Sequence, residues 1–215
     1  MRHTIRTAMV GLGLLIASTT AVEAQLVNMP TRALPSSFGN PSSSVAAFYG
    51  RGLNDASGKQ NAYGLAYART GLGDRVNVGI SGAMVDLDPD SKFTFGGNVG
   101  VDLLGGDAST QISLQGGVGY LSLADQVSTT NVPVGVAVRG RVEGGATLGW
   151  WFMPRLNYTR ASVLGLTGSA TDLGASAGLD VTTSSGFGVN AALDLLASDP
   201  DAVWLFGIGA HYVIG

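Results

Sequence analysis

The sequence predicts an all-β protein: a closed antiparallel up-and-down transmembrane β-barrel of about ten strands, with eight or twelve as the alternatives. Three observations predict it: an alternation of apolar and polar residues, an apolar composition without a long apolar run, and an export signal. Residues 75–87 show the alternation, with one apolar face formed by Val76, Val78, Ile80, Gly82 and Met84. Side chains alternate across a strand, and a tilted strand of about 9–11 residues crosses a bilayer.

The N-terminus has the layout of a secretory signal peptide. Arg2 and Arg6 give it positive charge, residues 8–17 form a short apolar stretch, and residues 22–24 read Val-Glu-Ala. The apolar stretch is too short to span a membrane as a helix. We therefore predict a signal peptide over residues 1–24 and signal-dependent export to the outer membrane of a bacterial cell.

The composition is too apolar for an ordinary secreted domain. Charged residues make up 13% of the chain, against about 25% in soluble domains, and the mean hydropathy is +0.27. A barrel whose outside faces lipid explains this without a transmembrane helix. The chain has no cysteine, which excludes disulfides and thiolate metal sites, and no cofactor is expected. Its net charge of −3 gives no reason to expect a nucleic-acid partner.

Residues 25–42 contain three prolines and predict an irregular periplasmic segment, and residues 43–215 form the predicted barrel. Alternation and turn signals divide the barrel into ten strands. The predicted strands are 43–54, 61–71, 75–87, 91–104, 110–123, 131–142, 146–160, 171–183, 187–197 and 202–214. With the N-terminus in the periplasm, the outer loops are 54–60, 88–91, 124–130, 161–170 and 198–201. Outer loops should be longer than the inner turns at 72–74, 105–109, 143–145 and 184–186.

In each predicted strand, the apolar face is assigned to the lipid and the polar face to the lumen. Inward charges of both signs predict ion pairs in a wet lumen. This charge network comprises Lys92, Asp102, Arg139, Arg141, Glu143, Arg155, Asp180 and Asp194. Outward aromatic residues near strand ends predict girdles at the two membrane interfaces. They are Tyr158 and Trp204 at the outer side and Phe187 and Tyr212 at the inner side. Pro154 cannot donate to a ladder, which predicts a bulge or a break in its strand.

Two features of the sequence are candidates for a binding or catalytic site. Asp86, Asp88 and Asp90 form a tight acidic loop that could hold a hard cation, although Asp-Pro-Asp is also common in plain turns. His211 falls near the periplasmic end of the last strand, where a hydrogen-bonded structural role is expected rather than that of a catalytic base. No metal site and no enzymatic activity are predicted.

The alternating pattern over residues 43–215 resembles the small outer-membrane β-barrel proteins of Gram-negative bacteria, the OmpA-like and opacity-type superfamily. Members usually end on an aromatic residue read by the barrel-assembly machinery. Gly207, Tyr212 and the alternating last strand partly match that signal, although three residues follow Tyr212. The resemblance implies that machinery, outer-membrane lipids and lipopolysaccharide as partners. Omptin proteases are also ten-stranded, but their histidine lies in the outer half of the barrel, unlike His211.

The predicted function is structural or surface-interacting, with a largely filled lumen. Barrels of about eight strands are filled by side chains, whereas 16–18 strands leave an aqueous channel. Many inward Gly, Ala and Ser residues keep a narrow passive pore for small solutes as the alternative. A soluble secreted β-barrel carrier is the second alternative, and it would need the apolar faces turned inward. Arg139, Arg141 and Arg155 would close the lumen if they were stacked at one level.

Overall fold

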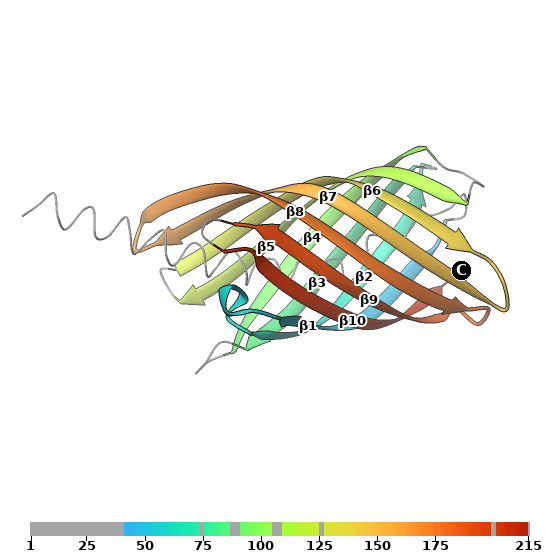
Figure 1. Cartoon of the computed structure of the whole chain (residues 1–215), viewed down its shortest axis with the longest axis horizontal. Helices are drawn as coiled ribbons and strands as arrows, with labels where there is room; N and C mark the ends of the chain where they lie inside the picture. The colour runs from blue at the N-terminus through green and yellow to red at the C-terminus, as the bar shows by residue number, and fades with distance from the viewer. Residues whose placement is uncertain are drawn as a thin grey trace, which may run out of the picture.

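The structure is a computed structural model that describes residues 41–73, 75–86, 91–104, 109–124, 127–198 and 201–214. These residues form a closed barrel of ten antiparallel strands in which every strand pairs with its sequence neighbours and β1 pairs with β10 (Figure 1). The predicted fold class is confirmed. Within the described part, no helix is long and apolar enough to cross a membrane. The predicted signal peptide and residues 25–40 lie outside the described residues.

The strand boundaries follow the alternation of the sequence. The strands are β1 (Ser43–Gly52), β2 (Asn61–Leu72), β3 (Val76–Asp86), β4 (Ser91–Leu104), β5 (Thr110–Ala124), β6 (Val127–Val142), β7 (Ala146–Val163), β8 (Leu166–Thr183), β9 (Phe187–Ala197) and β10 (Val203–Ile214). A single turn of 3₁₀ helix, η1 (Asp55–Ser57), lies between β1 and β2. Each predicted strand corresponds to one observed strand.

The two ends of the barrel differ, and we name them by what they carry. The terminal rim holds the start of β1 and the end of β10, which are paired through Ser43 and Ile214. The η1 rim is the opposite end, where η1 and the β7–β8 hairpin lie (Figure 1). Hydrogen bonding of the barrel begins at Ser42, whose carbonyl accepts from Thr70 N at 2.8 Å. The ladder thus includes the last residue of the segment predicted to be irregular.

Two of the predicted long loops are wrong. Residues 127–130 belong to β6, and residues 161–163 and 166–170 belong to β7 and β8. The β7–β8 connection is a two-residue turn with both backbones left-handed, Leu164 at φ 53° and Gly165 at φ 80°. The extra strand residues are mostly Ser, Thr, Ala and Gly, so they lack the apolar face that marks a lipid-facing strand. They pair nonetheless, because a hairpin ladder depends on backbone hydrogen bonds and tolerates polar faces outside the membrane.

Proline interrupts the ladder without shifting it. The β6–β7 register is the same at Gly135–Arg155 and at Val138–Phe152, and the two intervening pairs, one of which includes Pro154, are missing from the ladder. The β7–β8 ladder continues through Pro154. The bulge or break predicted at this residue is therefore wrong. The missing N–H of Pro154 affects only the side of β7 that pairs with β6, and the strand itself continues. Pro133 causes a similar gap in the β5–β6 ladder.

Candidate functional site

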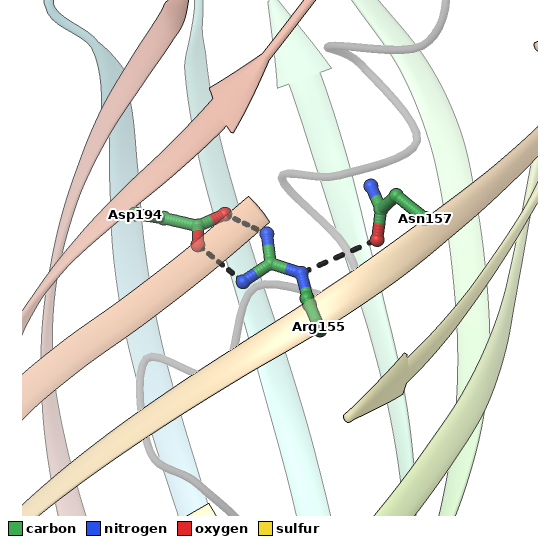
Figure 2. Close-up of polar contacts among 3 residues, drawn as sticks. All are labelled: Arg155, Asn157 and Asp194. Carbon is green, nitrogen blue, oxygen red and sulfur yellow. Dashed lines mark hydrogen bonds and ion pairs between the residues drawn. The ribbon is translucent and has the colours of Figure 1, made fainter. Parts of the chain in front are cut away.

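A buried ion pair occupies the middle of the lumen. Arg155 on β7 binds Asp194 on β9 through two parallel contacts, Nη1–Oδ1 and Nη2–Oδ2, both 2.6 Å (Figure 2). Arg155 Nε donates a third hydrogen bond to Asn157 Oδ1 at 3.2 Å. The ion-paired side chains are only 3% and 1% exposed. This fork geometry satisfies both carboxylate oxygens, which offsets much of the cost of removing the two charges from water.

Two glycines on β8 let long side chains of β7 cross that strand to reach β9. A Cβ on Gly174 would lie 3.4 Å from the guanidinium of Arg155, which passes over β8 to Asp194. A Cβ on Gly178 would lie 2.1 Å from the ring of Trp151, which packs on Ala192 of β9. Inward glycines thus make room for larger neighbouring side chains.

Replacing Gly178 by Val should disrupt this packing. The new side chain would overlap the Trp151 ring and displace it, and overpacking of this kind costs about 1–3 kcal/mol of stability. Gly168→Val on the same strand is the matched control, because no atom lies within 4 Å of its Cβ position. Urea unfolding in lipid vesicles, followed by tryptophan fluorescence, measures both variants. Equal stability of the two variants would contradict the proposed packing role of Gly178.

A cluster of buried apolar side chains, which we call the apolar plug, lies at the η1 rim. It is formed by five buried residues from four strands, and Ala56 of η1 packs on it. These five are Ala62, Val85, Leu196, Val203 and Leu205. Hydrogen bonds hold the segment before η1 against this plug. Their acceptors are Trp204 of β10 and Ala202, the residue before β10. Leu53 N donates to Trp204 O at 2.8 Å, and Asn54 Nδ2 donates to Ala202 O at 2.7 Å.

The η1 turn also carries an exposed ion pair between Lys59 Nζ and Asp55 Oδ1 at 2.7 Å. A hydrogen bond and the charge of Lys59 hold the pKa of Asp55 below its ordinary value. The pair stabilises the folded protein above the ordinary carboxyl pKa, and this contribution is lost as the pH falls through the lowered pKa. In an NMR titration, Lys59→Met should raise the midpoint of Asp55 toward the ordinary value. An unchanged midpoint would show that Lys59 does not determine it.

Polar groups fill the lumen toward the terminal rim. His211 Nε2 lies 3.0 Å from Thr182 Oγ1, and His211 Nδ1 lies 3.5 Å from Asp180 Oδ2. The Thr182 hydroxyl donates to Asp180 Oδ1 at 2.9 Å. Across the barrel, Asn77 Nδ2 donates to both oxygens of Asp102 at 3.0 Å. The sequence did not reveal the role of Thr182 or Asn77, because any inward polar residue fits the same alternation.

The outside of the barrel is apolar and carries aromatic side chains. The four residues predicted as girdles are all exposed there, each at 43% or more: Tyr158, Phe187, Trp204 and Tyr212. Phe187 and Tyr212 are paired with each other near the terminal rim. Two further aromatic pairs lie on the same outer face, with ring centroids 5.3 Å and 5.4 Å apart: Tyr49 with Tyr63, and Phe95 with Tyr120.

Comparison with known proteins identifies the fold. No protein-family model and no curated protein matches the sequence. The β domain of the Bordetella autotransporter BrkA aligns with a TM-score of 0.51 at 14% identity, covering 80% of this chain and 98% of that one. The translocator domain of NalP from Neisseria meningitidis gives 0.48 at 10% identity, covering 94% and 98%. The N-terminal barrel of Pseudomonas aeruginosa OprF gives 0.40 at 14% identity, covering 80% and 97%.

The BrkA comparison, with a TM-score above one half, carries the assignment. The chain has the fold of a bacterial outer-membrane β-barrel. At this identity the likeness concerns the arrangement of strands alone.

Within this outer-membrane barrel fold, the predicted charge network is divided among separate groups. Arg155 and Asp194 are joined in mid-lumen, whereas Asp180 and Asp102 contact other polar groups nearer the terminal rim. Arg141 Nη2 lies 3.1 Å from Glu143 Oε1 in a partly exposed pair. Lys92 is partly buried on β4 near the η1 rim, and Arg139 is buried on β6.

Arg155 is not at the same level of the lumen as Arg139 and Arg141. Arg139 is paired with Trp151, four residues along β7 from Arg155. Asp194 is the register partner of the plug residue Leu205, so the ion pair adjoins the plug, whereas the polar groups around His211 lie nearer the terminal rim. Of the predicted cation loop, Asp86 is described and accepts a hydrogen bond from Ser91 Oγ at 2.9 Å. Asp88 and Asp90 lie outside the described residues. Among the described residues there is no group of three or more side chains able to hold a metal ion.

Proposed function

We propose that this protein is an integral outer-membrane β-barrel with a structural or surface-interaction role and a lumen closed by its own side chains. The observation that carries the proposal is that buried side chains occupy the lumen from the η1 rim toward the terminal rim. The apolar plug lies at the η1 rim, the Arg155–Asp194 pair adjoins it, since Asp194 is the register partner of Leu205, and buried polar groups follow toward the terminal rim. An ordinary passive pore needs a continuous water path, which the plug opposes.

The exterior supports membrane integration. Large apolar side chains are exposed on every strand of the described barrel, for example Leu65, Ile80 and Leu173 at 66% or more. Soluble monomers rarely expose contiguous apolar patches of more than a few hundred Å². The apolar faces point outward, which is the reverse of what the secreted-carrier alternative requires. Lipid chains are the solvent that such a surface fits.

One observation favours the narrow pore as a second candidate. Asn98 on β4 faces the lumen, yet it is exposed. Its neighbours on the lumen face of β4 are Gly96 and Gly100, which leave space beside it. Water can therefore enter part of the lumen, and the two candidates differ in whether the plug and the ion pair stop it.

Two measurements separate these candidates. Protein refolded in detergent should migrate differently on a gel before and after boiling, which reports a closed barrel. In a planar bilayer it should then give no steady conductance steps. The double variant L196G/L205G shortens two plug residues and should introduce conductance. Steady small steps from the unmodified protein would instead establish the pore. A protein that stays soluble without detergent and shows no gel shift would refute membrane integration.

Orientation in the outer membrane is testable because the chain lacks cysteine. We place the terminal rim in the periplasm and the η1 rim outside the cell. A membrane-impermeant maleimide added to intact cells should label Leu164→Cys, whose native side chain is exposed at the β7–β8 turn. Gly144→Cys on the terminal rim should be labelled only after the cells are broken. The opposite pattern would reverse the orientation, and an unlabelled Leu164→Cys in isolated outer membranes would contradict its exposure.

Lipids and the assembly machinery are the partners this role implies. On the outer face, a groove of about 660 Å³ is lined by small and branched apolar residues of β8, β9, β10 and β1, including Ala47, Leu179, Ala191 and Ile208. A groove of this chemistry suits the acyl chains of outer-membrane phospholipid or lipopolysaccharide. Tyr212, exposed near the end of β10, fits recognition by the barrel-assembly machinery.

The Asp180–His211–Thr182 cluster is proposed to be structural rather than catalytic. The His211 side chain is fully buried, so a substrate could not reach it. The Thr182 hydroxyl directs its proton to Asp180 and is not poised as a nucleophile toward the imidazole. A nucleophile must instead be activated by a neighbouring base. We therefore propose no enzymatic activity for this barrel.

A further inference from the structure

The wall of the barrel is uneven at the η1 rim. Strand length rises from 10 residues in β1 to 18 in β7 and β8, then falls to 11 in β9. The last pair between β8 and β9 is Leu173–Ala197, whereas β8 stays paired with β7 as far as Leu166–Val163. Residues 166–172 of β8 therefore have a strand on one side and, in the described part of the chain, none on the other. We call these residues the open edge. The β7–β8 hairpin extends past its neighbours in Figure 1.

The backbone of the open edge can be oriented from Pro154. The β6–β7 ladder lapses at this residue while the β7–β8 ladder does not, so the backbone of Pro154 faces β6. The N–H and C=O groups of successive residues point to opposite neighbouring strands. Those of the odd-numbered residues of β7 therefore point to β8. In an antiparallel ladder such residues exchange both hydrogen bonds with their partners, which here include Gly168 and Ala170. The backbone N–H and C=O groups of the residues between and beside those partners point away from β7. These residues are Thr167, Ser169 and Thr171.

A second set of hydrogen bonds gives the same result. Leu53 N donates to Trp204 O, so even-numbered residues of β10 face β1 and odd-numbered ones face β9. Following the register from β10 through β9 to β8, the odd-numbered residues of β8 face β9. Leu173 meets Ala197 in this way. Beyond that pair, Thr167, Ser169 and Thr171 direct their N–H and C=O groups to the side where β9 has ended.

The open edge carries one charged residue, Asp172, but lacks the other devices that usually protect a sheet edge. Thr167, Ser169 and Thr171 are exposed. The edge contains no proline and no lysine, and its ladder with β7 runs without a bulge. Natural edge strands are normally blunted by these features, because an exposed row of N–H and C=O groups is a template for another strand.

We infer that the open edge is a docking site for an extended segment of another protein, which adds to β8 as a further strand. Only a backbone in the extended conformation can satisfy alternating donors and acceptors along seven residues. Threonine and serine on the edge favour a partner strand rich in β-branched or hydroxyl residues on the matching face. The inference relies on the proposed orientation, which places this edge outside the cell.

A second copy in the same membrane does not fit the open edge. Strands of such barrels tilt by about 35–45° from the axis, and two copies with the same orientation are related by rotation about the membrane normal. Their β8 strands would then cross at about 70–90°, twice the tilt, which does not allow a ladder. The occupant is therefore a segment of a different polypeptide that approaches from outside.

Proline substitution gives a selective test. Ser169→Pro removes an N–H that faces the open side, a position where proline is tolerated in an edge strand, so the barrel should still fold. Ser169→Ala keeps the N–H and is the matched control. The full-length protein, refolded in detergent, is used to select binders from a display library of random linear 12-residue peptides. Selected peptides should bind the unmodified protein and Ser169→Ala alike, and bind Ser169→Pro at least about tenfold more weakly.

Amide hydrogen exchange locates the bound peptide. The amides of Thr167, Ser169 and Thr171 should become protected on binding. Selection of no binder, or of binders that do not distinguish Ser169→Pro from Ser169→Ala, would overturn the inference. The heat-dependent gel shift is recorded for every variant. Loss of that shift in the unmodified protein would contradict the proposed barrel function, whereas a normal shift without edge binding would contradict the docking site alone.

Discussion

Replacement of Arg155 by Met is expected to lower the free energy of unfolding by about 3–5 kcal/mol, the cost of leaving one partner of a buried pair without the other. The Asp194 carboxylate would lose two contacts of 2.6 Å in a site where its side chain is 1% exposed. Methionine keeps much of the length of the side chain, so the loss of charge and hydrogen bonds dominates over the loss of volume.

The double variant R155M/D194L tests this explanation. Replacing both members of a buried pair by apolar residues is often neutral or stabilising, so the double variant should recover most of the lost stability. Lys59→Met, which breaks the exposed pair with Asp55, is the control and should have little effect. Urea titration in lipid vesicles, followed through the three tryptophans, measures all three variants. A single Arg155 variant as stable as the unmodified protein would show that the pair does not hold the lumen together.

The architecture was predictable from the sequence because each strand meets lipid on one face. Period-two alternation over residues 75–87 and 91–104 results directly from the difference between bilayer and lumen. The faces of β9 show the same, since Asp194 is buried in the lumen and Leu193 is exposed outside. Where this contrast ends, prediction failed: in residues 161–170 the regular alternation stops, and Ser, Thr, Ala and Gly outnumber the apolar residues Val163, Leu164 and Leu166. Thr167, a residue type that favours strands, was the signal that could have indicated the longer ladder.

The filling of the lumen was predictable only in kind. Alternation indicated that Arg155 and Asp194 face inward, but their pairing crosses β8 and depends on the register of three strands. The apolar plug was missed for a related reason. Leu196 and Leu205 stand on the inward face, where the pattern predicts polar residues, and their packing against each other arises from the closure of β9 on β10. Single-strand periodicity carries no information about which inward side chains meet.

Replacement of Ile80 by Arg tests the lipid-facing surface and is expected to lower stability by about 2–4 kcal/mol, the cost of a cationic side chain near the bilayer midplane. Ile80 lies in the middle of β3 and its side chain is 66% exposed on the outer face. The long arginine side chain can place its charge near the membrane interface. In a thin bilayer the loss of stability should therefore lie in the lower part of this range.

Two controls separate lipid exposure from general intolerance of arginine. Ser91→Arg places the charge on the same outer face but at the η1 rim, beside Asp86, where the cost should be about 0–1 kcal/mol. Asn98→Arg places it on the exposed part of the lumen face of β4, where water can solvate it. Stabilities are compared in vesicles of short-chain and long-chain lipids, because a thicker bilayer raises the cost at Ile80 alone. A cost at Ile80 equal to that at Ser91, in both lipids, would mean that this face does not meet the bilayer core.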